Sequence, residues 1–554
     1  MNPAVIRERP PQAAPPTVLP SSWQLGKTQG RLVVSALTVV GLLLRLHLLN
    51  QSLTGDEVST YWIVVGHGLG QAVQLTHSPQ ETTPPLFFVA AWLTQGLLGN
   101  PGESIRLVPL VAGTLTIPMT YVLGVRTVGR SAAVVGAALI MGSPFLITYS
   151  VDARAYMLAT LLVLLAGWFL LRFLDSGGWG WAAGYAVFTC AALYTHYVVV
   201  FVLGAQLVWA FWAHRWARRT LVVSNLAALF GFAPWAGRVW SDFHGPNYIA
   251  YYQPFGVNTF FRVLERFSLG QGYYTLSTLP GSTGLALLTA GAAVCVVGLA
   301  LRWRAGRLHL GRFSSRNWLV VVLALATPVG AGLYSLIGSD VFDSRNMIIS
   351  WPGLALTVGA VVALIPQTLR LLSLVLLVGG LLFGTARLLD PVYQPSDVNG
   401  AASYIYRVGT SGDPVVVVPA YAYPLTEEDV AFKDLGGSTP KRFVSYRIDA
   451  PPRSASVRAA LTQGNAWPPT IHPVAPAVIA KEAATQTAAR GRILFYIAGP
   501  TPLADYGFFP NTPAAKFLSA LPRTLRPFRE TTFPGLDGMA EIGVFEFHNT
   551  APRS

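Results

Sequence analysis

Long apolar segments recur along most of this sequence and constrain its fold more than any other feature. About 20 apolar residues in a helix cross the roughly 30 Å hydrocarbon core of a bilayer. Charged residues make up only 12% of the chain, far below the share of about 25% in soluble domains. The sequence therefore predicts a polytopic α-helical membrane protein. The segments lie near residues 32–49, 84–98, 106–125, 131–149, 155–174, 180–194, 197–213, 220–237, 283–301, 317–337, 346–365 and 369–388.

Basic residues between these segments predict the orientation of the chain. If every segment spanned the bilayer, several basic loops would lie opposite the basic N-terminal tail, against the positive-inside rule. The segment 84–98 begins with two prolines and is short, so we interpret it as a helix lying at the membrane interface. About eleven spans then remain, with a cytoplasmic N-terminus and an extracytoplasmic C-terminus. The basic loops contain Arg126 and Arg130, His214 to Arg219, and Arg302 to Arg316.

Composition along the chain predicts three parts. Residues 1–30 carry several prolines and arginines and read as a disordered cytoplasmic tail. Residues 31–390 form the membrane-embedded domain, in which the outer loop 50–106 is expected to be catalytic. Residues 391–554 have the composition of a small extracytoplasmic α/β domain. Its expected elements are an amphipathic stretch at 398–408, strands at 415–418, 492–498 and 543–547, and a helix at 513–521.

The net charge of +14 does not indicate a nucleic-acid partner, because the basic residues cluster in short loops between membrane segments. The partner implied by composition is the lipid bilayer. Arginine greatly outnumbers lysine, which is typical of GC-rich bacterial genomes and favours a bacterial cytoplasmic membrane.

Polar residues gather in the loops predicted to lie on the outer side. Ionisable groups at this depth are costly in lipid and usually face a cavity or a substrate. Each has a simpler explanation: an arginine can snorkel to the interface, a tyrosine can anchor there, and Asp152 can pair with Arg154. Their common side favours a site for the head group of a lipid-linked substrate. The residues are Asp56, Glu57, Tyr149, Asp152, Arg154, Tyr156, His196 and Arg345.

The order of these motifs resembles the integral-membrane glycosyltransferases of the C superfamily (GT-C). Within it, the chain is most similar to family 39, which includes protein O-mannosyltransferases and aminoarabinose transferases. The likeness covers roughly residues 30–390. One position departs from the pattern, since aminoarabinose transferases usually have a lysine where this chain has Thr83. The motifs are Gly55-Asp56-Glu57, Thr83-Pro84-Pro85-Leu86, Asp152-Ala153-Arg154-Ala155-Tyr156, Tyr194-Thr195-His196-Tyr197 and Ser344-Arg345-Asn346.

The resemblance implies transfer of a sugar from a polyprenyl-phosphate donor to a glycan, lipid or protein acceptor on the outer side of the membrane. Asp56 is the expected general base, and Glu57 is expected to orient the acceptor or the loop. Charge on the departing phosphate would be stabilised by Arg154 and Arg345. Tyr149 and His196 would add hydrogen bonds, with Asp152 and Tyr156 in support. A single displacement would invert the anomeric centre.

No cofactor is expected. Asp56, Glu57 and Asp152 offer oxygen ligands for a divalent cation, yet their spacing matches no specific metal motif. Two other functions remain open. A transporter or flippase of a lipid-linked or envelope precursor would carry ionisable residues near the bilayer midplane and internal repeats. A sensor or scaffold would need no collected set of carboxylates and arginines on one face.

Overall fold

The computed structural model describes residues 25–78, 81–244, 254–269, 281–306, 314–418, 427–435, 443–448, 475–490, 492–498, 513–535 and 542–549. Residues 1–24 of the predicted tail lie outside this set. The chain forms two compact units. The helical unit comprises Met1–Leu48, Glu81–Ala91 and Arg106–Arg387, and the mixed unit comprises Leu49–Gln80, Trp92–Ile105 and Leu388–Ser554. Most of the loop 50–106 thus belongs with the C-terminal part.

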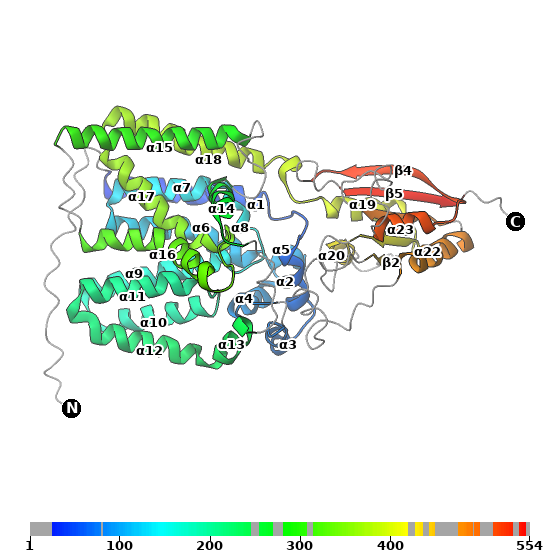
Figure 1. Cartoon of the computed structure of the whole chain (residues 1–554), viewed down its shortest axis with the longest axis horizontal. Coiled ribbons are helices and arrows are strands. Elements are labelled where there is room, and N and C mark those ends of the chain that lie inside the picture. Colours follow the sequence, from blue (N-terminus) through cyan, green and yellow to red (C-terminus); the bar gives the residue numbers. More distant parts are fainter. Residues whose placement is uncertain are drawn as a thin grey trace. The chain divides into compact units, whose positions relative to one another are not determined.

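Long helices build the helical unit (Figure 1). Among the described residues, eight helical stretches are long and apolar enough to cross a membrane. The shorter helices α7, α10 and α11 match the remaining predicted spans. The helices are α1 (Lys27–Leu46), α6 (Leu107–Thr127), α7 (Arg130–Gly142), α8 (Pro144–Tyr149), α9 (Tyr156–Ser176), α10 (Trp179–Leu193), α11 (Val199–Ala213), α12 (Arg218–Phe232), α13 (Ala236–His244), α14 (Val257–Leu269), α15 (Gly281–Arg304), α16 (Ser315–Ile337), α17 (Trp351–Leu364) and α18 (Gln367–Leu388).

The predicted interface segment 84–98 contains only the short helix α4 (Leu86–Thr94). Its nine residues rise about 14 Å, less than half the thickness of the hydrocarbon core. A helix of this length is too short to cross the membrane, as the prediction requires.

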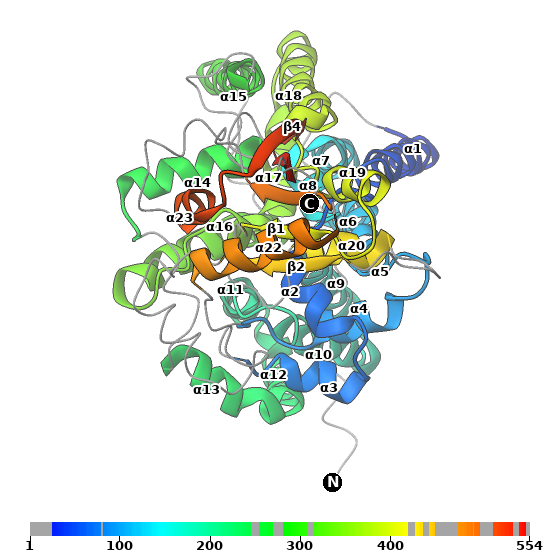
Figure 2. The same ribbon diagram turned by 90° about the vertical axis from the view of Figure 1, so that its right-hand side faces the viewer.

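Helix α9 occupies the centre of the helical unit, whereas α1 and α15 lie at its edge, where Figure 2 shows them end-on. The apolar window of α9 is 72% buried, against 22% for α1 and for α15. Large apolar side chains remain exposed on the outlying helices, including Leu32, Phe230 and Val296. In a membrane protein such side chains face lipid, which costs nothing in a hydrocarbon environment.

Two glycines let α17 pack closely against its neighbours. A Cβ atom at Gly353 would lie 2.3 Å from the backbone nitrogen of Ala324 on α16. One at Gly359 would lie 2.3 Å from the carbonyl oxygen of Ala132 on α7. Small residues permit such backbone approach between membrane helices. The approach fixes the start of α17, and with it the preceding 3₁₀ helix η6 (Arg345–Ser350).

The mixed unit contains a sheet of five strands within the described residues, in the order β2-β1-β3-β5-β4. Strand β1 pairs in parallel with β2 and β3, while β5 pairs antiparallel with β3 and β4. The prediction of a small C-terminal α/β domain is confirmed. The strands are β1 (Pro414–Val417), β2 (Val444–Arg447), β3 (Leu494–Ala498), β4 (Leu525–Phe533) and β5 (Ile542–Asn549).

Apolar side chains alternate along the central strands, so both faces of the sheet are covered. Val416 and Tyr496 point to one face, where they join a core with α22 and α23. Val415 and Phe495 point to the other face, where they join a core with α19 and α20. The helices of this unit are α2 (Asp56–Val64), α3 (Leu69–Leu75), α5 (Pro101–Ser104), α19 (Val398–Val408), α20 (Glu427–Leu435), α22 (Pro476–Arg490) and α23 (Pro513–Ala520).

Candidate active site

Asp56 and Glu57 form the first turn of α2 in the mixed unit. Gly55 precedes them with φ 51°, a left-handed conformation that favours glycine, so the chain reverses sharply into the helix. Asp56 is half-buried, and the buried Glu57 accepts a hydrogen bond from the backbone of Thr54 at 3.4 Å. Carboxylates at a helix N-terminus are favoured by the helix dipole. The position alone therefore explains two acidic residues without a catalytic role.

A carboxyl group far away in the sequence holds this turn. The backbone N–H of Gly55 donates to Oε1 of Glu427 at 2.9 Å. Loss of hydration, followed by the charge of Glu428, raises the pKa of Glu427 to about 8. The nearby charge of Glu57 acts in the same direction, and the hydrogen bond from Gly55 opposes it.

In the helical unit, Arg154 is the centre of a buried polar cluster. Its two terminal nitrogens donate to the two carboxylate oxygens of Glu81, at 2.8 and 3.0 Å. One of them also donates to Oγ1 of Thr83 at 3.0 Å. This planar two-pronged contact is the strongest geometry for an arginine–carboxylate pair. Arg154 therefore holds the Glu81–Thr83 turn, a role that the sequence alone did not predict.

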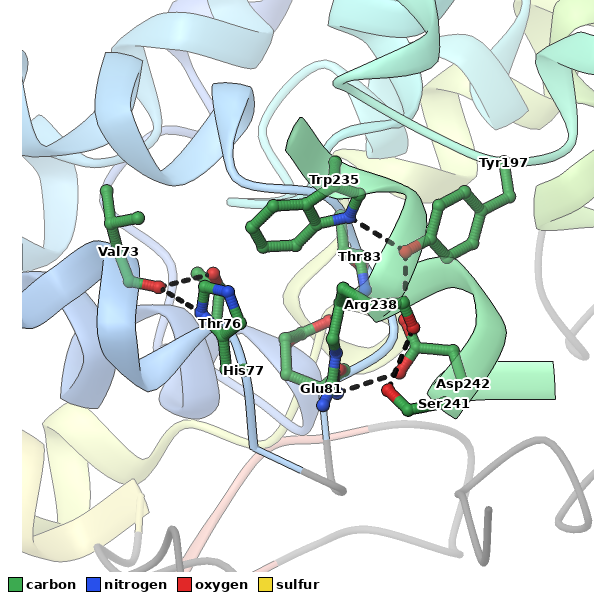
Figure 3. A network of polar contacts seen from close by, with 10 residues as sticks. All are labelled: Val73, Thr76, His77, Glu81, Thr83, Tyr197, Trp235, Arg238, Ser241 and Asp242. Atoms are coloured by element: carbon green, nitrogen blue, oxygen red, sulfur yellow. Dashed lines mark hydrogen bonds and ion pairs between the residues drawn. The ribbon is translucent and has the colours of Figure 1, made fainter. Parts of the chain in front are cut away.

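Helix α13 holds the same turn from a second direction (Figure 3). Arg238 donates to the backbone carbonyl of Glu81 at 3.0 Å and pairs with Asp242 at 2.8 Å. Tyr197 donates to the same aspartate at 2.8 Å, and its oxygen accepts a hydrogen bond from Trp235 at 2.9 Å. Sequence reasoning missed Arg238 and gave no role to Asp242. The available signal was their i,i+4 spacing at the end of an apolar segment.

Three aromatic rings lie in a row beside Arg154. The centroid of Tyr156 lies 5.2 Å from that of Tyr149 and 5.4 Å from that of His196. Tyr149 ends α8, Tyr156 begins α9, and His196 lies in the turn between α10 and α11. The structure thus brings together three residues that the sequence placed in two separate loops.

His196 is neutral and lies in a positive electrostatic field. Loss of hydration, followed by the charges of Arg154 and Arg345, lowers its pKa to about 3. Its Nδ1 atom accepts a hydrogen bond from the backbone of Val198 at 3.3 Å, so the ring proton is assigned to Nε2. In this form the ring offers a hydrogen-bond donor without a charge of its own.

Arg345 begins η6 and is half-buried. Its Nε atom lies 3.4 Å from Oδ1 of Asp343, and its backbone N–H donates to the same oxygen at 3.0 Å. Asp152 lies in the turn before α9, where its carbonyl oxygen accepts from the backbone of Arg154 at 2.6 Å.

The predicted residues thus divide between the units. Five of them gather in the helical unit, together with Glu81 and Thr83. They are Arg154, Arg345, Tyr149, Tyr156 and His196. Asp56 and Glu57 lie in the mixed unit with Glu427. Across the described ranges, no group of three or more His, Cys, Asp or Glu side chains is arranged to hold a metal ion.

One protein family matches part of the chain. The family described as dolichyl-phosphate-mannose-protein mannosyltransferase matches residues 82–237. The matched part includes Arg154 and His196 and begins one residue after Glu81. A search of curated protein sequences finds no match.

Solved structures share the fold at low sequence identity. ArnT from Cupriavidus metallidurans, bound to undecaprenyl phosphate, is 14% identical, with a TM-score of 0.51 over 94% of this chain and 98% of that one. AglB, an archaeal oligosaccharyltransferase from Archaeoglobus fulgidus in complex with an inhibitory peptide and a dolichol-phosphate, is 11% identical, with a TM-score of 0.50 over 89% and 72%. The family match over residues 82–237 and the shared fold show that the chain is similar to membrane glycosyltransferases of the GT-C superfamily and resembles family 39.

Proposed function

We propose that this protein transfers a sugar from a polyprenyl-phosphate donor to a hydroxyl-bearing glycan, lipid or protein acceptor. The observation that carries the proposal is the placement of His196 near Arg154 and Arg345, whose positive charges both act on it. Such a field favours an anion, and a lipid phosphate is the anion that reaches a membrane enzyme from within the bilayer. ArnT and AglB, which share the fold, were solved with undecaprenyl phosphate and a dolichol-phosphate.

In this proposal the two arginines have different roles. Arg345 contacts the departing phosphate directly, and the Nε2 proton of His196 adds a hydrogen bond to it. Arg154 keeps the Glu81–Thr83 turn in place through its two-pronged contact. Its positive charge also stabilises the phosphate without direct contact. Tyr149 supports the ring of Tyr156, while Asp152 shapes the turn that carries Arg154.

Asp56 is the proposed general base that accepts the proton of the acceptor hydroxyl, with Glu57 orienting the turn. The acceptor oxygen attacks the anomeric carbon as the bond to the lipid phosphate breaks, so the configuration inverts. The reaction needs no divalent cation because the arginines carry the phosphate charge. A chelator is therefore expected to leave transfer unchanged.

We place the reaction on the outer face of a bacterial cytoplasmic membrane, with the N-terminus in the cytoplasm and residues 391–554 outside. The distribution of basic loops supports this orientation. Reporter fusions after Arg219 should therefore report cytoplasm, and fusions after Gln394 should report the outer side. An outward signal at Arg219 would contradict the orientation.

Binding of the lipid alone tests the donor class. Purified protein in detergent should retain polyprenyl phosphate in native mass spectrometry. Arg345→Ala should weaken that binding, whereas the matched variant Arg126→Ala should not. Equal binding by both variants would contradict the proposed phosphate site. Loss of one sugar from the envelope glycans of a deletion strain would then name the donor and the acceptor.

A further inference from the structure

Helix α20 contacts the segment that carries Asp56 at two points, within the mixed unit. At the first residue of α20, Glu427 accepts from the backbone of Gly55 at 2.9 Å. Near its end, Asp434 accepts from the hydroxyl of Tyr61 at 2.8 Å. Two contacts at separate points fix both the position and the direction of α2, which a single contact would not do.

Further contacts strengthen this attachment. The ammonium group of Lys433 lies 5.2 Å from the centroid of the Tyr61 ring, within cation–π range. The backbone N–H of Gly102 in α5 also lies close enough to the carboxylate of Asp434 to favour its charged form. Helix α19 adds a further contact, because the backbone N–H of Asn399 donates to Oγ of Ser52 at 2.9 Å.

The carboxyl groups in these contacts carry an energetic cost. Loss of hydration raises the pKa of Glu427 to about 8 and also raises the pKa of Asp434. Glu57 and Glu428 add like charge beside Glu427. Neutral side chains would hold the helix without this cost in free energy. Buried ionisable groups with shifted pKa values concentrate at functional sites, which favours a functional role for this attachment.

The contact with Gly55 acts directly on the backbone before Asp56. Gly55 has φ 51°, and its N–H is the group that Glu427 holds. Rotation of this peptide would redirect the Asp56 side chain, which follows one residue later. Displacement of a reacting group by about 1 Å can cost about 100-fold in rate.

We propose that Glu427 and Asp434 of α20 are positioning residues that hold Asp56 in its reactive orientation, so that the C-terminal part of the chain completes the catalytic turn. The inference rests on the proposed role of Asp56 as general base. It assigns to the C-terminal domain a role in catalysis.

The test compares steady-state transfer by three variants. Glu427→Ala should lower kcat about 10- to 100-fold while leaving the KM for the lipid donor unchanged. Glu427→Gln keeps an oxygen that accepts from Gly55, so it should recover most of kcat. The exposed Glu482 on α22 of the same unit provides the control, and Glu482→Ala should behave as wild type.

The pH profile gives a second readout. Above pH 8 the wild-type Glu427 becomes charged beside Glu57 and Glu428. The charged oxygen is the better acceptor from Gly55, but repulsion between the three carboxylates should displace α20 from the turn, so kcat should fall. Glu427→Gln should not show this fall. A structural role alone would not produce the difference.

If Glu427→Ala fails to fold, Tyr61→Phe tests the other contact, since it removes only the hydroxyl that donates to Asp434. Wild-type kcat in Tyr61→Phe and in whichever Glu427 variant folds, with Asp56→Asn inactive, would overturn this inference and leave the proposed function intact. Full activity of Asp56→Asn would instead show that the proposed base is wrong.

Discussion

The two ends of helix α9 each carry an arginine–carboxylate cluster, yet only one has the surroundings of an active site. At one end, Asp175 pairs with Arg126 at 2.7 Å and with Arg316 at 2.5 Å. At the other, Arg154 pairs with Glu81. The 21 residues of α9 put about 31 Å between these ends.

The balance of charge differs between the clusters. Each has a histidine, and burial lowers the pKa of both. At His214 the charge of Arg316 is opposed by that of Asp175, whereas both charges acting on His196 are positive. The Asp175 cluster ties helix ends together through one carboxylate shared by two arginines. At His196 two positive charges act in the same direction, so the signs of the charges acting on the histidine, rather than the number of ion pairs, distinguish the candidate site.

The largest expected effect separates two carboxylates. Asp56→Asn should reduce transfer about 10²- to 10⁴-fold in a folded protein, because the amide cannot accept the acceptor proton. Asp175→Asn should leave the rate per folded molecule near wild type. Turnover and thermal unfolding would be measured on both. Near-normal turnover of Asp56→Asn beside an inactive Glu57→Gln would show that the base was misassigned.

The next effect separates two arginines. Arg345→Ala should reduce transfer about 10²- to 10³-fold, since it removes stabilisation of the developing phosphate charge. Arg345→Lys should recover only part, because lysine lacks the planar fork. Arg126→Ala, at the other end of α9, should change the rate little. Similar losses for Arg345→Ala and Arg126→Ala would erase the distinction between the two ends.

A smaller effect concerns stability. Glu81→Gln leaves Arg154 buried without a charged partner and should lower stability by about 1.5–3 kcal/mol, the range for hydrogen bonds to charged groups. Thermal unfolding in detergent would detect the shift. An unchanged unfolding temperature would mean that Arg154 does not depend on Glu81 for its position.

The smallest effect is a pH dependence. The ordinary histidine pKa is about 6.5 and that of His196 in the folded protein is about 3, so the unfolded chain binds the extra proton between these values. The contribution of His196 is therefore complete above pH 6.5 and is lost as the pH falls toward 3. The unfolding temperature of His196→Gln should fall less over this range than that of wild type. If the unfolding temperatures of His196→Gln and wild type fell equally with pH, His196 would not be neutral in the folded protein.

Much of the fold follows from sequence because lipid demands continuous apolar helices. The membrane helices match the predicted segments, and α19, β1, β3, α23 and β5 match the predicted C-terminal elements. Helix α20 was missed because its nine residues mix acidic, basic and apolar types without a clear period. Strand β4 was missed because its polar residues follow one another and Pro527 interrupts them.

The site was less predictable because its contacts join distant residues. The sequence suggested Arg154 as a phosphate ligand but could not show that Glu81, 73 positions earlier, holds it in two-pronged geometry. Likewise, nothing local in Gly55-Asp56-Glu57 indicates the carboxyl of Glu427, 372 positions away from Gly55. Motif spacing locates candidate residues, whereas partners across the fold decide their roles.

Reconstituted transfer tests the central claim most directly. Purified protein in lipid vesicles would be supplied with a panel of polyprenyl-phosphate sugars or with the corresponding nucleotide sugars, and product would be followed by mass spectrometry. The proposed function predicts consumption of a lipid-linked sugar, no use of the nucleotide sugar, and no effect of chelator. Robust transfer from a nucleotide sugar, or full activity of the Arg154→Ala/Arg345→Ala double variant, would contradict it.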